Sequence, residues 1–266
     1  MKIENEFLSL DVELEAAEMH SLIDKRNLKE LLWQGDPTYW AGRNPILFPI
    51  IGSTFDKKIH LFGKEYVMGN HGFTRNSLFT LISHTKNQMT LVLEANETTL
   101  AQYPFNFTLF VTYTLNDHAV NIDYRIENND HQIMPFSFGL HPAFALDRSD
   151  SAQVEFPEVE KDPVLIDGLR ANMNDEFFKT HASFRIEYIN SLYIDLVRKD
   201  ARIRVSCEGY RWVVFWKKPG ASFLCIEPWH GHGDFEETTT DFFAREGTIL
   251  LNPQEFYTTS YSITVL

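Results

Sequence analysis

The sequence predicts an all-β fold, a large antiparallel sandwich of two sheets with few short helices, and three observations favour it. Several segments alternate apolar and polar residues with a period of two, as strands buried on one face do. Clusters of turn-forming residues separate these segments at intervals of roughly 8 to 12 residues, the spacing of sandwiches and barrels. The chain is also rich in rings, with 22 Phe and an aromatic content of 14%, and aromatic side chains favour strands.

The N-terminal part is where local propensity conflicts with this fold class. Residues 13–32 contain many good helix formers, namely Ala, Glu, Leu, Met and Lys. The apolar positions of the segment do not recur at the 3.6-residue spacing of an amphipathic helix. We therefore assign no helix to it.

The clearest strands lie in the middle and in the second half of the chain. In residues 105–115 apolar side chains alternate with Asn and Thr, and residues 120–126 and 202–207 repeat the pattern. Turn signals such as Asn116-Asp117 separate these runs. No repeat, low-complexity tract or Pro/Ser-rich linker interrupts the sequence, so we expect a single domain over residues 1–266.

Charge and hydropathy exclude several classes of partner. The formal net charge is −13, and no Lys/Arg cluster is dense enough to attract nucleic acid or an anionic membrane. The N-terminus lacks the apolar stretch of a signal peptide, and no apolar run is long enough to span a membrane. We therefore expect a cytoplasmic protein with neither nucleic-acid nor membrane partners.

The two cysteines, Cys207 and Cys225, both lie in strand-like runs. Neither belongs to a CxxC or another metal-binding spacing. We expect both thiols to be reduced and buried, although a disulfide between neighbouring strands stays open.

Three polar residues, far apart in the chain, each lie in a short turn-like cluster after a strand-like run. His71 stands before a glycine and His141 before a proline, so both imidazoles could be held at defined angles. Histidine carries protons near neutrality because its unperturbed pKa is about 6.5. Glu227 precedes a Pro-Trp pair, and partial burial beside Trp229 would raise the pKa of its carboxyl and make it a usable base. Each residue alone also fits a structural role; together they predict an acid–base site in a sugar-sized cleft.

A competing motif follows Glu227 directly. His230, His232 and Asp234 form an HxHxD string with a glycine at each intervening position. Zinc sites use three or four ligands at fixed spacing, and flexible Gly-separated histidines are weak evidence for one. We expect no metal there and interpret the string as a flexible lip beside Glu227. The sequence also contains no GxSxG elbow and no phosphate-cradling Gly-rich loop.

With these residues assembled, the chain resembles the aldose 1-epimerase (mutarotase-like) superfamily over nearly its whole length. A near-terminal segment, residues 251–263, resembles the family's last strands. The other markers, in chain order, are residues 43–52, His71-Gly72-Phe73-Thr74-Arg75, Leu140-His141-Pro142-Ala143-Phe144 and Cys225-Ile226-Glu227-Pro228-Trp229.

The resemblance implies a β-supersandwich with a cleft on one sheet face, and a cofactor-independent interconversion of the α and β anomers of a hexose. Glu227 matches the family's general base, which takes the proton of the C1 hydroxyl, and His141 matches the general acid, which protonates the ring oxygen. His71 matches the second histidine, which hydrogen-bonds the sugar. A small-molecule sugar is the implied partner, and a homodimer stays open. The implied substrate-binding residues are Arg43, Arg75, Trp229, Phe144 and His181.

The chain departs from the galactose mutarotase pattern at three places. Phe73 stands where those enzymes have a second glycine, Arg43 precedes Asn44 instead of following an Asn, and His181 lies where the family's substrate-gripping aspartate is expected. The first two features are similar to the hexose-6-phosphate 1-epimerase branch, whose arginines can pair with phosphate. A phosphosugar epimerase, a non-catalytic sugar-binding protein and a metal-dependent hydrolase using the HxHxD string are the alternatives.

Overall fold

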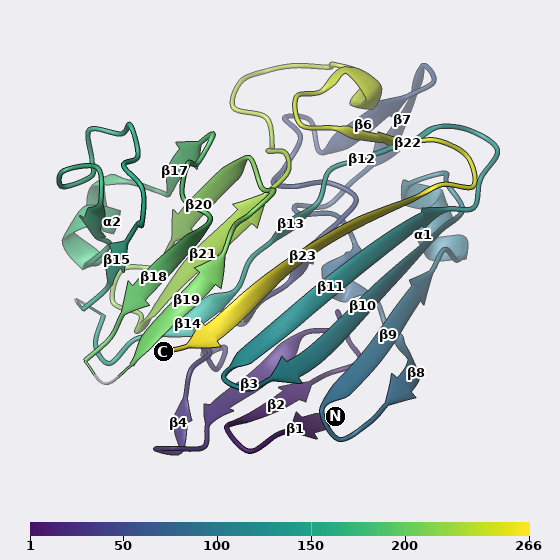
Figure 1. Cartoon of the computed structure of the whole chain (residues 1–266). Coiled ribbons are helices and arrows are strands. Elements are labelled where there is room, and N and C mark those ends of the chain that lie inside the picture. Colours follow the sequence, from purple (N-terminus) through teal and green to yellow (C-terminus); the bar gives the residue numbers. More distant parts are fainter. Residues whose placement is uncertain (150, 200) are drawn as a thin grey trace.

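Antiparallel strands make up most of the chain in the computed structural model, which describes residues 1–149, 151–199 and 201–266 (Figure 1). In this described part only two short α-helices occur, α1 (Glu97–Gln102) and α2 (Asp175–Thr180). Each helix begins after an asparagine whose side chain caps it, Asn96 for α1 and Asn174 for α2. The predicted all-β fold with few short helices is confirmed.

The largest sheet of the described residues has nine strands in the order β16-β15-β18-β19-β23-β11-β10-β9-β8, all antiparallel to their neighbours. Its long central strands run side by side across the molecule in Figure 1. The predicted runs 105–115, 120–126 and 202–207 correspond to its strands β10, β11 and β19. The bounds are β8 (Thr80–His84), β9 (Gln88–Glu94), β10 (Phe107–Asn116), β11 (Ala119–Asn128), β15 (Gln153–Glu155), β16 (Arg170–Asn172), β18 (Tyr193–Val197), β19 (Arg202–Ser206) and β23 (Phe256–Val265).

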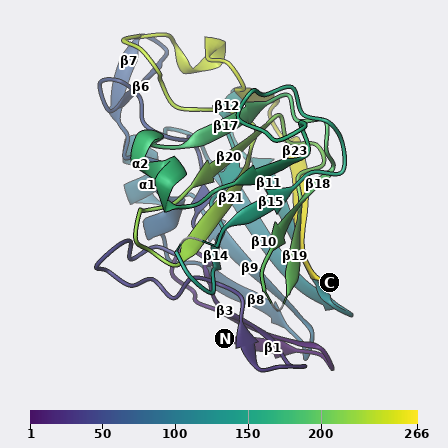
Figure 2. The same cartoon turned by 90° about the vertical axis from the view of Figure 1, so that its left-hand side faces the viewer.

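A second sheet, with six strands in the described part of the chain, has β21 at its centre. Strand β21 pairs with β20 on one side, and with both β13 and β14 on the other. In the turned view of Figure 2, β20 and β21 overlie the long strands of the larger sheet. The bounds are β5 (Ile46–Leu47), β13 (Gly139–Leu140), β14 (Ala143–Ala145), β17 (Phe184–Glu187), β20 (Trp212–Trp216) and β21 (Phe223–Trp229).

The remaining elements form small sheets and turns around these two layers. Residues 13–32 hold strands and no helix, as expected, because their apolar side chains pack into the core from β3. The bounds are β1 (Lys2–Glu4), β2 (Leu8–Val12), β3 (Met19–Asp24), β4 (Lys29–Glu30), β6 (Lys58–Leu61), β7 (Lys64–Val67), β12 (Met134–Phe136) and β22 (Ile249–Leu251), with 3₁₀ turns η1 (Thr74–Asn76) and η2 (Phe242–Ala244).

The core lies between the two large sheets. From the nine-stranded sheet, alternate residues of β10 such as Leu109 and Val111 enter it. From the six-stranded sheet, Leu224 and Ile226 of β21 enter the same core. Because successive strand residues point to opposite faces, Glu227 must lie on the face of β21 that points away from this core.

The cysteine prediction is confirmed, because Cys207 and Cys225 are both free and buried. Burial raises the pKa of both thiols, to about 12 for Cys207. Of the helices in the described residues, none is long and apolar enough to cross a membrane.

Candidate active site

A pocket of about 450 Å³ opens on the face of the six-stranded sheet that points away from the core. It combines ionisable side chains with aromatic walls. Three segments far apart in the sequence, around residues 71, 141 and 227, meet there, together with two tryptophans from further segments. The lining residues are Trp40, Gly52, Asn70, His71, Arg75, His141, Ala182, Ser183, Val214, Trp216, Glu227 and Trp229.

Strand β21 places Glu227 on the pocket floor. Val214 of β20 is its neighbour across the ladder, and the carboxyl is almost completely buried, with 1% of the residue exposed. Burial raises the pKa of the Glu227 carboxyl well above its usual value, and the Trp229 indole N–H offsets part of that shift. Glu227 is therefore poised to hold a proton that an ordinary surface glutamate would have lost.

His141 lies beside Glu227, with its Nε2 3.4 Å from the Glu227 Oε2. Neither the Glu227 Oε2 nor the His141 Nδ1 has a hydrogen-bond partner among the described residues, although both atoms are buried. Burial lowers the pKa of the His141 imidazole well below its usual value, and the nearby His71 adds to this effect. Two buried polar groups without partners are costly unless a ligand completes their hydrogen bonds.

The Gly-Leu-His-Pro stretch explains how His141 reaches this position. Gly139 pairs with Trp229 across the sheet, and a Cβ on Gly139 would lie 2.8 Å from the Trp229 ring. Glycine thus lets the Trp229 indole approach β13 closely beside the pocket. The chain then turns at Pro142, whose carbonyl accepts a hydrogen bond from the Ile226 N–H.

His71 is fixed through both its backbone and its ring. Its N–H donates to the Gly52 carbonyl at 2.7 Å, and its Nδ1 accepts from the Gly52 N–H at 3.0 Å. An imidazole whose Nδ1 accepts a hydrogen bond carries its proton on Nε2 when it is neutral. Burial, with a smaller contribution from the charge of Arg75, lowers the pKa of His71 to about 4. At neutral pH His71 is therefore a neutral hydrogen-bond donor at Nε2.

The backbone at His71 and Gly72 adopts an uncommon conformation with positive φ. His71 has φ = 65°, in the left-handed region that non-glycine residues rarely adopt. Gly72 follows with φ = 74°, and a Cβ there would lie 2.2 Å from the Phe48 carbonyl oxygen. Gly72 is thus required by the turn that presents His71 to the pocket.

Aromatic rings hold the two histidines in place. The His141 ring centroid lies 4.9 Å from Trp40, 5.6 Å from Trp216 and 5.5 Å from His71. Trp40 and Trp216 also contact each other edge to face, with 5.2 Å between their centroids. These rings give the pocket rigid apolar walls around its few polar groups.

Arg75 is the cationic member of the pocket lining. It comes from the short turn η1, directly after the His71 segment, and is partly exposed. Among the described residues, no acidic side chain forms an ion pair with it. An unpaired guanidinium at the rim offers planar, paired hydrogen-bond donors to an anionic or hydroxyl-rich ligand.

Of the predicted site residues, the pocket brings together His71, His141, Glu227, Arg75 and Trp229. The other three predicted binding residues lie outside it.

Arg43 turns its guanidinium away, with Nη2 donating to the Gln34 carbonyl at 2.9 Å, and only its backbone carbonyl helps by holding Ala143 of β14. Phe144 is fully buried in the main core. Successive strand residues point to opposite faces, and Ala143 next to it takes the face that carries the site. His181 is exposed and stacks on Phe177 at 4.3 Å. Its neighbours Ala182 and Ser183 line the pocket instead.

Several lining residues were not predicted from the sequence, chiefly Trp40, Trp216, Val214, Asn70 and Ser183. The signal for two of them was present in β20, where Val214 and Trp216 alternate with the core residues Val213 and Phe215. Trp40 lies in a loop, where no periodicity can reveal which side of the chain faces a pocket.

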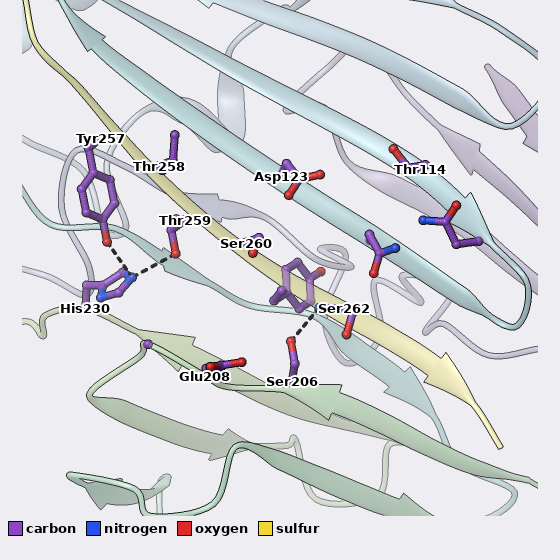
Figure 3. A pocket seen from close by; sticks show the side chains of 14 residues that line it. Thr114, Asp123, Ser206, Glu208, His230, Tyr257, Thr258, Thr259, Ser260 and Ser262 are labelled. Atoms are coloured by element: carbon purple, nitrogen blue, oxygen red, sulfur yellow. Dashed lines mark hydrogen bonds between the residues drawn. The ribbon is translucent and has the colours of Figure 1, made fainter.

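The HxHxD string does not converge on one point. His230 turns toward strand β23, where its Nε2 lies 3.0 Å from the Tyr257 hydroxyl and 3.2 Å from the Thr259 hydroxyl (Figure 3). His232 contacts Glu246, and Asp234 pairs with Arg245 at 2.6 Å. Within the described part of the chain, these three residues do not form a group of metal-ligating atoms.

The hollow that His230 lines is larger than the pocket beside Glu227, at about 620 Å³. It extends over β10, β11, β19 and β23, and six of its fourteen lining residues are Ser or Thr (Figure 3). It lacks a buried acid–base pair in its lining, so the pocket with His141 and Glu227 is the better candidate for an active site.

Comparisons with known proteins show the family to which the chain belongs. The family model described as aldose 1-epimerase matches residues 1–264. The protein LacX (plasmid) of Lactococcus lactis subsp. lactis is 27% identical, with 100% of this chain and 99% of that protein covered.

Solved structures give the same result. A galactose mutarotase-like protein from Lactobacillus casei matches with a TM-score of 0.94 at 25% identity, covering 100% of this chain and 99% of that chain. A galactose mutarotase related enzyme from Lactobacillus acidophilus matches with a TM-score of 0.92, also at 25% identity, covering 100% of this chain and 97% of that chain.

Proposed function

The chain belongs to the aldose 1-epimerase family, and from this premise we propose that it interconverts the α and β anomers of a hexose by acid–base catalysis. The observation that carries the proposal is the buried pair on the pocket floor, in which the His141 Nε2 lies 3.4 Å from a Glu227 Oε2 that has no hydrogen-bond partner among the described residues. A donor and an acceptor this close can serve the two oxygens bonded to the anomeric carbon of one sugar.

The pair holds one proton that can be carried by either partner. Burial favours the uncharged forms, a protonated Glu227 and a neutral His141. Transfer of that proton from Glu227 to His141 creates a carboxylate base and an imidazolium acid together, without changing the net charge of the site. Hydrogen bonds from a bound sugar would stabilise this charged form.

Ring opening then follows from these two groups. Glu227 takes the proton of the C1 hydroxyl, His141 gives its proton to the ring oxygen, and the C1–O5 bond breaks as C1 becomes an aldehyde. Rotation about the C1–C2 bond turns the other face of the carbonyl toward O5. Reclosure with the roles reversed yields the other anomer, and both residues return to their starting states.

The neighbouring residues position the sugar. His71 donates from Nε2 to a sugar oxygen, since its Nδ1 is occupied by the Gly52 N–H. Trp40, Trp216 and Trp229 provide apolar walls against the C–H faces of the ring and exclude water from the pair.

NMR exchange spectroscopy or polarimetry on freshly dissolved α-hexose, against a protein-free control, tests the proposal. Glu227→Gln keeps the shape of the side chain but removes the base, and we expect it to lower the protein-dependent rate by about 100-fold or more, as for loss of a general base. His141→Asn should have a similar effect. Glu160→Gln changes another buried glutamate outside the pocket, with 2% of Glu160 exposed, and should retain activity. Unchanged exchange rates in the Glu227 and His141 variants would refute the assignment of roles.

A second candidate substrate is a hexose 6-phosphate, and Arg75 in the pocket lining, which forms no ion pair within the described part of the chain, favours it. Guanidinium binds phosphate through paired, charge-assisted hydrogen bonds, which are stronger than the hydrogen bonds it makes with the neutral hydroxyls of a free hexose. If the substrate is phosphorylated, Arg75→Ala should raise KM for the 6-phosphate by about tenfold or more, the loss of one charge-assisted contact. The KM for the free sugar should then change much less. Equal effects on both sugars would exclude a phosphate-binding role for Arg75.

A further inference from the structure

One side chain next to the site that can ligate a metal has no part in the proposed reaction, namely Cys225. It lies two positions before Glu227 on β21, and therefore on the same face of the strand. Its residue is completely buried, behind the pocket floor, where Trp40 and Trp216 pack against the cluster that contains it. Each of His141, Cys225 and Glu227 has a ligand atom within 4.8 Å of those of the other two.

The separation of the His141 and Glu227 ligand atoms fits two ligands of one metal ion. Two ligands about 2.0 to 2.2 Å from a zinc ion, at a tetrahedral angle, lie roughly 3.4 Å apart. The His141 Nε2 and the Glu227 Oε2 are separated by 3.4 Å. The Glu227 Oε2 is buried without a hydrogen-bond partner among the described residues, so it is available as a ligand atom.

We propose that His141, Cys225 and Glu227 form a binding site for a zinc-like divalent cation. The three side chains supply nitrogen, sulfur and oxygen, the donors that zinc takes in proteins. Mg²⁺ and Ca²⁺ prefer six or more oxygen ligands and do not suit this set. The fourth position of the ion faces the pocket, where water completes a tetrahedron, and the ion reaches the site from the pocket that His141 and Glu227 line.

The charges of such a complex balance. Binding ionises the thiol and the carboxyl and releases two protons, so two negative ligands and one neutral imidazole surround a cation of charge +2. The buried cluster stays neutral overall, which avoids the cost of an uncompensated buried charge.

An ion bound in this way stops the acid–base pair. A carboxylate and an imidazole that both ligate a metal can neither take nor give the protons of ring opening. We therefore expect the ion to inhibit anomer exchange in competition with the sugar. This inhibitory consequence rests on the proposed epimerase function; the binding of the ion does not.

Titration with Co²⁺ tests the site without any measurement of activity. Thiolate coordination to Co²⁺ gives a charge-transfer absorption band, which we expect to saturate at one ion per chain and to disappear on addition of excess Zn²⁺. Cys225→Ser and Cys225→Ala should abolish the band while far-UV circular dichroism stays native.

Cys207→Ser is the matched control, because Cys207 is the other buried thiol and donates its hydrogen bond to the Ser191 carbonyl, outside the pocket. It should keep the band. Absence of a band in the wild-type chain, or a band that survives in both Cys225 variants, would overturn the proposal.

Zn²⁺ inhibition of anomer exchange separates the two proposals. Cys225→Ala should exchange anomers at the wild-type rate and require at least tenfold more Zn²⁺ for half-inhibition. A cobalt band in a chain that catalyses no exchange would leave the metal site standing and refute the epimerase. Exchange that Zn²⁺ inhibits equally in wild type and Cys225→Ala would refute Cys225 as a ligand.

Discussion

His71 makes two hydrogen bonds with Gly52. Its backbone N–H donates to the Gly52 carbonyl, and its Nδ1 accepts from the Gly52 N–H. This arrangement fixes the ring, the tautomer and the left-handed backbone together. The buried ring resists protonation, which is why its pKa falls to about 4. Because the fold keeps the His71 imidazole neutral, the stability of the protein depends on pH.

Between about pH 6.5 and pH 4 the unfolded chain binds a proton at His71 that the folded chain does not bind. Stability must then fall as the pH falls through this window, and the full contribution of His71 is about 3 kcal/mol, from a shift of roughly 2.5 pKa units at 1.36 kcal/mol each. Urea unfolding near neutral pH and near pH 4 measures the effect.

His71→Asn is the informative variant for this measurement. Asparagine tolerates the left-handed backbone, and its side-chain oxygen can accept the Gly52 N–H, but it does not titrate. It should lose less stability on acidification than the wild-type chain does. His230, with a pKa of about 4 for the same reason of burial, remains in both proteins and cancels in the comparison. An equal loss in the variant would mean that His71 is not held neutral by the fold.

At the scale of elements, β21 divides its residues between two environments. Leu224 and Ile226 enter the main core, while Cys225, Glu227 and Trp229 occupy the opposite face. The ladder to β13 depends on Gly139, because a Cβ there would lie 2.8 Å from the Trp229 ring and 2.9 Å from the Ile51 side chain. The close packing of β13 against β21 therefore also sets the position of Trp229 in the pocket.

Gly139→Ala should destabilise the fold by about 1 to 3 kcal/mol, the usual cost of overpacking, and should also lower activity by displacing Trp229. Gly69→Ala is the control: it lies two residues before His71, and the nearest atom to its Cβ would be 3.7 Å away. Thermal unfolding and anomer exchange measure both effects. If Gly139→Ala matched the control in both, the close contact with Trp229 would not matter.

The sequence predicted the long strands because alternation is a direct consequence of having one buried face. Strands β10, β11 and β19 were recognisable for this reason. The two-residue strands β5 and β13 were not, since they are too short for any period and exist only because β21 pairs with β13 and β13 with β5.

The site was predictable to the extent that its residues stand in recognisable motifs. Residue type and order brought out His71, His141 and Glu227, and the fold collects them in one pocket. Arg43 shows the limit, because its side chain does not line the pocket and only its backbone contributes, through the hydrogen bond to Ala143. Which way a side chain turns in a loop depends on tertiary neighbours such as Gln34, which no local pattern encodes.

At the scale of the whole molecule, both ends of the chain belong to one core. Ile3 of β1 and Val265 of β23 are members of the same buried cluster, and β23 completes the nine-stranded sheet between β11 and β19. Neither large sheet can bury its apolar face without the other. We therefore propose a single folding unit over residues 1–266.

The tryptophans allow this unit to be tested layer by layer. None of the five Trp lies in a strand of the nine-stranded sheet; Trp212, Trp216 and Trp229 lie in β20 and β21. Tryptophan fluorescence thus reports on the six-stranded layer, whereas far-UV circular dichroism reports on all strands. We expect one denaturant transition with the same midpoint by both probes, because exposing the inner face of either sheet removes the core of the other. A fluorescence transition at lower denaturant than the dichroism transition would instead mean that the layer carrying His141 and Glu227 can unfold while the nine-stranded sheet persists.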